Sequence, residues 1–171
     1  MKKTVWLLAL APLLMFASCT KDSGSIKDNS IKASIDDTAR TFNFAATATY
    51  VSTASPYSLV LYAGTGASSN EGVTLSISQT GIPITAGTYT QSGGAGVYVI
   101  GGVYNPGTTV TSEIYGAGFN VGADPQFTIT ITSISATNVT GTFSGAFYDN
   151  SGFGSNKKVF SNGQFNLAIQ Q

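Results

Sequence analysis

The stretch Phe127-Thr128-Ile129-Thr130-Ile131-Thr132 decides the fold class, because a large apolar residue alternates with threonine throughout it. Such alternation buries one face of a β-strand and exposes the other, as in antiparallel sheets. Threonine on the exposed face keeps strand propensity high without adding charge. The same period recurs in Ile31–Ile35, Phe42–Tyr50 and Val73–Ile77. The sequence therefore predicts an all-β protein.

Turn-forming residues, such as Asp36-Asp37 and Asn105-Pro106-Gly107, separate the alternating segments. They divide the chain into about nine or ten strands at the spacing of all-β sandwiches and barrels. We expect one antiparallel domain folded as a two-sheet β-sandwich; the alternative is a closed, lipocalin-like β-barrel. Tyr57–Tyr62 and Val97–Ile100 are apolar on both faces, which predicts central strands or one wall of a cavity.

Two details of the strands carry more specific expectations. In the segment 42–50, one face should hold Phe42, Phe44, Ala46, Ala48 and Tyr50. An aromatic residue also follows a glycine by two positions in three places, Gly87–Tyr89, Gly141–Phe143 and Gly163–Phe165. Both residues then lie on the same strand face, where the glycine permits close approach and an aromatic ring can cover it.

Composition removes most active-site chemistry. The chain has 171 residues, with 8 basic and 8 acidic side chains, no histidine and one cysteine. The absence of histidine excludes Ser-His-Asp and Cys-His nucleophile pairs and histidine-rich zinc sites. A single cysteine cannot form an internal disulfide or a thiolate zinc site. We therefore expect no cofactor and no metal.

The distribution of charge argues against nucleic acid as a partner. No lysine or arginine occurs between Arg40 and Lys157, although phosphate backbones are bound through clustered cations. The body of the domain therefore lacks the basic surface that such binding needs.

The N-terminus combines Lys2 and Lys3 with the apolar run Val5–Phe16, which is within signal-peptide length and too short to cross a bilayer. The following Phe16-Ala17-Ser18-Cys19 resembles the lipobox of bacterial lipoproteins, with phenylalanine where leucine is usual. The resemblance implies cleavage before Cys19, a diacylglycerol on its sulfur and a further acyl chain, such as palmitate, on its amine. Two or three acyl chains are enough for stable anchoring.

The resulting organisation is a signal peptide over 1–18, a flexible tether with lipidated Cys19 over 19–30, and a β domain over 31–171. Thr20 is not aspartate, so the enteric inner-membrane retention signal is absent and the outer membrane is favoured. Lys21-Asp22 weakly resembles the surface-export signal of Bacteroidota lipoproteins, and the periplasmic and surface faces both stay open. The segments 127–145 and 160–165 are similar to small Bacteroidota lipoproteins of unknown function, which implies one β domain behind a lipid anchor and no catalytic residues.

The acidic residues give no clear catalytic or metal motif. Glu71 and Glu113 are the only glutamates, and nothing in the sequence places them together as a glycoside hydrolase requires. Asp36-Asp37 and Asp149–Gly152 do not fit a calcium loop and are better interpreted as turns.

Aromatic side chains near glycine-rich segments are the candidate ligand contacts, for a glycan or a peptide. They are Tyr104, Tyr115, Phe119, Tyr148 and Phe153. Packing in the core is the favoured interpretation of these rings. Thr38 lies in Asp37-Thr38-Ala39, which matches the O-glycosylation motif of exported Bacteroidota proteins.

Together these features predict a lipid-anchored, non-catalytic cell-envelope protein with a binding, adhesion or structural role. Its partners would be the membrane, through Cys19, and a glycan, peptide or protein ligand. The competing hypothesis is a β-barrel that carries a small apolar ligand, and the least favoured is a glycoside hydrolase with paired acids.

Overall fold

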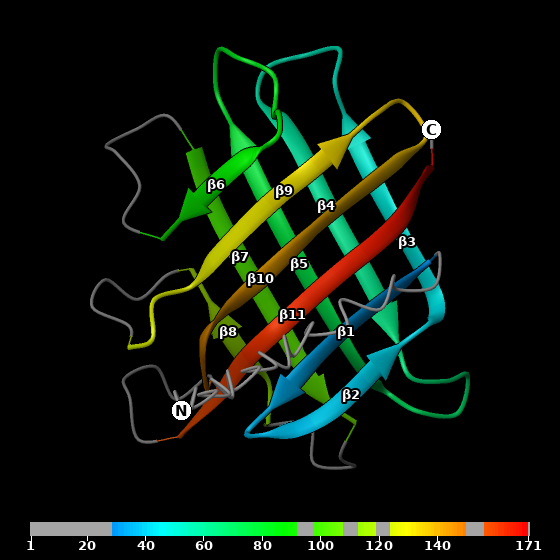
Figure 1. Cartoon of the computed structure of the whole chain (residues 1–171), viewed down its shortest axis with the longest axis vertical. Helices are drawn as coiled ribbons and strands as arrows, with labels where there is room; N and C mark the ends of the chain where they lie inside the picture. Colours follow the sequence, from blue (N-terminus) through cyan, green and yellow to red (C-terminus); the bar gives the residue numbers. More distant parts are fainter. Residues whose placement is uncertain (1–28, 92–97, 108–112, 119–123, 150–155, 171) are drawn as a thin grey trace, which may run out of the picture.

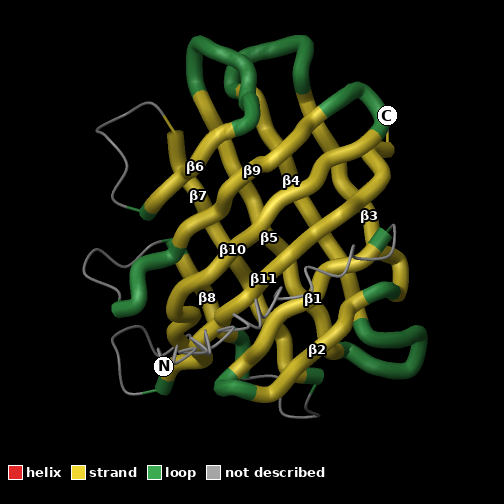
Figure 2. Tube along the Cα trace, viewed as in Figure 1, coloured by secondary structure: helices red, strands yellow, loops and turns green. Residues whose placement is uncertain are grey.

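A computed structural model of the chain describes residues 29–91, 98–107, 113–118, 124–149 and 156–170. The described residues form eleven strands and no helix (Figure 2), which confirms the all-β prediction. The strands are β1 (Ser30–Ile35), β2 (Thr38–Phe42), β3 (Phe44–Val51), β4 (Tyr57–Gly64), β5 (Glu71–Gln79), β6 (Gly87–Thr90), β7 (Tyr98–Pro106), β8 (Tyr115–Ala117), β9 (Thr128–Ile134), β10 (Asn138–Asp149) and β11 (Lys157–Gln170). Within the described ranges, no helix suited to crossing a membrane occurs. The expected signal peptide and Cys19 lie outside them.

The strands belong to one sheet in the order β2-β1-β11-β3-β4-β5-β7-β8-β10-β9-β6, with an additional pairing of β10 and β11. This sheet folds over on itself, so that β9, β10, β11 and β1 lie in front of β4, β5 and β7 (Figure 1). At one side β3 pairs with both β11 and β4, and at the other β8 pairs with both β7 and β10. All eleven described strands thus belong to one continuous sheet that folds back on itself, where the sequence had predicted two separate sheets.

Large side chains fill the space between the layers. The fully buried phenylalanines are Phe42, Phe127, Phe147, Phe160 and Phe165. Phe147 contacts two of the other rings, with centroids 4.3 Å apart for Phe147 and Phe160 and 5.2 Å apart for Phe127 and Phe147. The interior formed by the described strands is thus a packed aromatic core.

Two of the three glycine–aromatic pairs behave as expected. Gly141 lies opposite Phe165, and Gly163 lies opposite Phe143, on the paired strands β10 and β11. Each ring covers the glycine of the other strand, and a Cβ added to Gly163 would lie 2.6 Å from the Phe143 ring. The third pair differs, because a Cβ at Gly87 would meet no atom within 4 Å.

The expectation that Phe42 and Phe44 share one face is wrong. Phe42 is fully buried, whereas Phe44 is 43% exposed. The chain leaves β2 after Phe42, and the pairing of β3 with β4 shifts register between Phe44 and Thr47. Ala45 adopts a φ of 49° at this irregularity, so the alternation is interrupted and one expected strand becomes two.

The apolar strands β4 and β7 occupy central positions in the sheet, on either side of β5, as their sequences predict. Only one face of each is buried. The other face exposes apolar side chains to solvent, including Val60 (37%), Tyr62 (42%) and Val99 (61%). Serine and threonine residues of β5 lie between these apolar side chains. Ser78 is paired with both Ser58 and Val99, and Thr74 is paired with Tyr62.

Candidate functional site

A pocket of about 490 Å³ gathers charged side chains at the end of the sheet where β1 turns into β2. This charged pocket is lined by Ile35, Asp36, Thr38, Arg40, Glu71, Tyr104, Pro106, Glu113, Tyr115 and Lys158. Five of these ten residues are charged, out of ten lysine, arginine, aspartate and glutamate residues in the whole described part of the chain. In a protein with so few charges, their convergence makes this pocket the principal candidate site.

Three strands contribute one hydrogen-bonded network to the charged pocket. Arg40 of β2 pairs with Glu71 of β5, with Nε 3.3 Å from Oε1. The hydroxyl of Tyr104, on β7, donates to the same Oε1 at 3.0 Å. Burial and the hydrogen bond to Glu71 both raise the pKa of Tyr104, so its hydroxyl remains protonated as a donor.

A second ion pair lies at the turn between β1 and β2. Lys158 Nζ is 2.9 Å from Asp36 Oδ2, and the Val159 amide donates to Asp36 Oδ1 at 2.9 Å. Burial alone would raise the pKa of Asp36, but the Val159 amide and the Lys158 ammonium together hold this pKa below its ordinary value of 3.8. The hydrogen bond to Asp36 raises the pKa of Lys158, whose Nζ also lies 5.8 Å from the Tyr115 ring centroid.

The backbone conformation of the turn between β1 and β2 accounts for the position of the Asp36 carboxylate beside Lys158. Asp36 and Asp37 adopt φ values of 46° and 63°, the backbone conformation that two-residue hairpin turns require and that aspartate tolerates. The Asp36 amide also donates to the Val159 carbonyl at 3.0 Å. The predicted turn therefore fastens β1 to β11 and aims its carboxylate at Lys158.

Glu71 and Glu113 both line the charged pocket, although the sequence offered no reason to place them together. Glu71 is occupied by Arg40 and Tyr104. Among the described residues, no group of three or more acidic or cysteine side chains is arranged to hold a metal ion. The pocket thus combines opposite charges and hydroxyl groups, a set suited to binding polar groups through hydrogen bonds.

The structure places the predicted site residues differently. Tyr104 and Tyr115 line the charged pocket, but they are only 4% and 8% exposed and so form its floor rather than a surface for ring stacking. Tyr148 is partly buried, and its hydroxyl accepts a hydrogen bond from the Asp124 amide at 3.2 Å. Thr38 is exposed at the start of β2 and also lines the charged pocket. Cys19, Phe119 and Phe153 lie outside the described residues.

Sequence reasoning missed the charged partners of this pocket, Arg40 and Lys158. They belong to strands far apart in the sequence, and only the pairing of β2 with β1 and of β1 with β11 brings them to one end. Their rarity was the available signal, because a domain with few charges has few places where several can meet.

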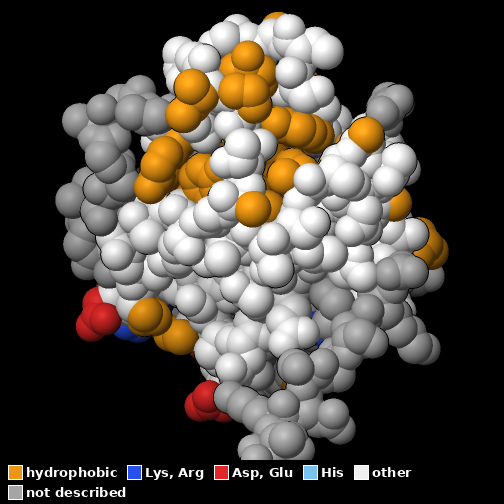
Figure 3. Space-filling model, turned by 45° about the horizontal axis from the view of Figure 1, so that its top comes forward, with side chains coloured by type: hydrophobic (Ala, Val, Ile, Leu, Met, Phe, Trp, Pro, Cys, Tyr) orange, Lys and Arg blue, Asp and Glu red, His pale blue; other side chains and the backbone are white. Residues whose placement is uncertain are grey.

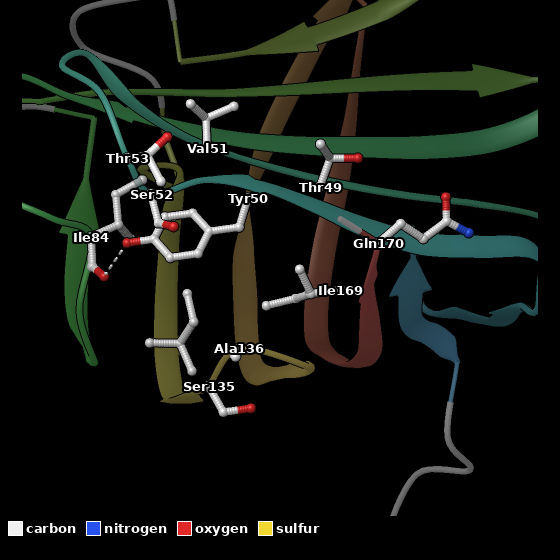
Figure 4. Close-up of a pocket in the computed structure, with 11 residues that line it drawn as sticks. Thr49, Tyr50, Val51, Ser52, Thr53, Ile84, Ser135, Ala136, Ile169 and Gln170 are labelled. Atoms are coloured by element: carbon white, nitrogen blue, oxygen red, sulfur yellow. Dashed lines mark hydrogen bonds between the residues drawn. The ribbon is translucent and has the colours of Figure 1, made fainter.

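A second hollow, of about 770 Å³, lies at the opposite end of the sheet (Figure 4). This apolar groove is lined by Thr49, Tyr50, Val51, Ser52, Thr53, Ile84, Ile134, Ser135, Ala136, Ile169 and Gln170. Its lining contains no charged side chain. The Tyr50 hydroxyl donates to the Ile84 carbonyl at 3.1 Å and so ties β3 to the connection between β5 and β6.

Comparison with known proteins finds no matching family model, no matching curated protein and no matching solved structure. The class of the protein is therefore defined by its own structure. It is an all-β protein with one continuous folded sheet, a charged pocket at one end and an apolar groove at the other.

Proposed function

We propose that this chain is a lipid-anchored, non-catalytic protein of the bacterial cell envelope, held at the outer membrane, that binds a polar ligand in the charged pocket. The anchor is supported by Phe16-Ala17-Ser18-Cys19, followed by a polar segment that leads into β1. The binding role is carried by one observation, the convergence of five charged side chains on a pocket floored by two tyrosines.

The arrangement of charges favours a ligand rich in hydroxyl or amide groups, a glycan or a peptide. Arg40 and Lys158 already have carboxylate partners in Glu71 and Asp36, so a strongly charged ligand would have to break an ion pair. Hydroxyl and amide groups both donate and accept hydrogen bonds. They can therefore bind to the remaining donors and acceptors of these ion pairs without breaking either pair. A small apolar ligand inside the sheet is not favoured, since the described core is filled by phenylalanine rings.

Binding of glycans and peptides can be tested with the full-length protein, processed in a bacterial host and extracted in detergent. We expect capture of a defined set of glycans or peptides on an array, and at least a tenfold loss of affinity in Arg40→Gln, which removes the ion pair with Glu71. Lys32→Gln is the matched control, because Lys32 is a partly buried basic residue of β1 outside the pocket. Unchanged binding by Arg40→Gln, with the fold intact by thermal melting, would place the ligand elsewhere.

The shared pocket of Glu71 and Glu113 supports one second candidate, a glycoside hydrolase with paired acids. The non-catalytic proposal is preferred because Arg40 and Tyr104 already hold Glu71. Glu113→Gln separates the two. If a glycan captured on the array is cleaved over time and Glu113→Gln abolishes the cleavage, the protein is an enzyme; stable capture by both forms supports a binding protein.

A further inference from the structure

The two ends of the domain differ sharply in charge. The connections 52–56, 80–86 and 135–137 surround the apolar groove, and none of them contains a lysine, arginine, aspartate or glutamate. We call this surface the apolar end. Figure 3 shows hydrophobic side chains gathered there, with the acidic and basic side chains in view lying well away from it.

The apolar end exposes large side chains both in the groove and beside it. Val51, which lines the groove at the end of β3, is 44% exposed, and Ile82, between β5 and β6 and outside the lining, is 56% exposed. Apolar side chains that cluster around a groove mark a surface for interaction, whereas singly scattered ones do not. A partner for this end must therefore be apolar where it makes contact.

The position at which the chain enters the domain, at Asn29, indicates what the partner of the apolar end is. The Asn29 side chain accepts a hydrogen bond from the Ala168 amide at 2.8 Å. Ala168 directly precedes Ile169 and Gln170, which line the groove. From Ser30, β1 then runs to Asp36 in the charged pocket, a span of about 20 Å for six strand residues. The chain thus joins the domain on the side of the apolar end.

The sequence before this entry point is short. Residues 20–28 separate Cys19 from Asn29, so even a fully extended tether reaches at most about 35 Å. Lipids on Cys19 would hold the membrane surface within that distance of the apolar end. If the charged end faced the membrane instead, the charged groups of the pocket would be removed from water, which is unfavourable. The apolar end has no such desolvation penalty, because its connections contain no charged residue.

We propose that the apolar end rests against the lipid surface to which Cys19 is anchored, so that the charged pocket faces away from the membrane. This inference rests on the lipid anchor in the proposed function and adds an orientation to it. The apolar side chains around the groove contact the lipid interface, and the pocket stays accessible to polar ligands in the surrounding aqueous space.

Site-specific fluorescence tests this orientation in the lipidated full-length protein, reconstituted in phosphatidylethanolamine–phosphatidylglycerol vesicles. Cys19 is the only cysteine and its sulfur is occupied by lipid, so one introduced cysteine takes the dye. Ile82→Cys places a polarity-sensitive dye at the apolar end. Ala67→Cys, exposed between β4 and β5 near Glu71, is the matched control.

We expect a blue-shifted emission at position 82 that spin-labelled lipid quenches almost completely, and neither effect at position 67. Equal quenching at both positions, or quenching at position 67 alone, would overturn the orientation. A dye at position 82 that is shielded from water but not quenched by lipid, with cross-linking to another copy at this position, would make a second copy of the chain the partner and overturn it as well.

A separate readout keeps the anchor distinct from the orientation. If the Cys19→Ser protein binds the vesicles as firmly as the original chain, the lipid anchor itself is wrong. If Cys19 is needed for binding but the dye at position 82 is not quenched, the anchor stands and the orientation is wrong.

Discussion

At the scale of single residues, the core depends on glycines that make room for rings on a neighbouring strand. Gly163 on β11 faces Phe143 on β10, and Gly141 on β10 faces Phe165 on β11. Each glycine leaves the volume that the opposite ring fills, and both rings are buried. The sequence showed the glycine–aromatic spacing within each strand, but the exchange between strands needs their register.

The substitution Gly163→Ala should lower the free energy of unfolding by about 1–3 kcal/mol, because overpacking a filled core forces neighbouring atoms apart. The added Cβ would lie 2.6 Å from the Phe143 ring. Urea denaturation measures the change. Gly66→Ala is the control, since a Cβ there meets no atom within 4 Å, and it should change stability by less than about 0.5 kcal/mol. Equal effects of the two substitutions would contradict this account of the core.

Asp36 should make stability depend on pH in the acid range. Its pKa is held below 3.8 in the folded protein, because the Val159 amide and Lys158 outweigh the effect of burial. A carboxyl group whose pKa is lowered by folding stabilises the folded protein. This contribution is complete at a pH above the pKa of the unfolded state, and it is lost as the pH falls through the pKa of the folded state. Asp36→Asn keeps a residue suited to the positive φ but should lack this contribution. Urea denaturation from pH 7 to pH 2.5 should therefore show a shallower loss of stability below pH 4 in the variant; parallel curves would refute the role of Asp36.

At the scale of the strands, alternation predicts which segments are extended but not where pairing is interrupted. The segment 42–50 alternates without a break in sequence, yet β2 ends at Phe42 and β3 begins at Phe44. β2 pairs with β1, whereas β3 pairs with β4 and β11. A change of partner requires the chain to bend, and Ala45 accommodates the resulting register shift. Sequence alternation contains no information about such a change.

β2 and β6 are the two edge strands of the sheet. Their amide hydrogens should exchange much faster than those of β5. The edge strands are only 5 and 4 residues long and pair on one side, whereas β5 pairs with β7 from Glu71 to Gln79 and with β4 from Gly72 to Gln79. Short edges limit pairing with other molecules but leave outward-facing amides open to water. Hydrogen exchange followed by mass spectrometry checks this, with β5 as the internal reference. Protection of β2 equal to that of β5 would show that another molecule or segment covers this edge.

At the scale of the whole molecule, the proposed function depends on the separation of charged and apolar side chains to opposite ends. The charged pocket collects residues from β2, β5 and β11, and the apolar groove collects residues from β3, β9–β10 and β11. One continuous sheet holds both ends in a fixed relation. The proposed ligand-binding and membrane-facing roles can therefore be assigned to opposite ends of one domain.

Among the polar residues of the N-terminal segment, only Cys19 should be required for attachment to the membrane. Replacing Cys19 by serine removes the sulfur that carries the lipid, so most of the protein should move from the membrane fraction to the soluble fraction. Ser25→Ala, in the same segment, should stay with the membrane. Fractionation of cells that produce each variant measures this. A Cys19→Ser protein that is fully processed and remains in the membrane would disprove the lipid anchor.

The sequence alone determined the all-β class, the turn at Asp36-Asp37 and the glycine–aromatic spacing, because each depends on neighbours within a few residues. The predicted anchor at Cys19 likewise needs only a short local motif. The tertiary structure decided that all strands belong to one sheet, that Tyr104 and Tyr115 form the floor of a pocket, and that Glu71 and Glu113 both line it. These features depend on strand order and register across distant segments, which similar alternating strands leave open.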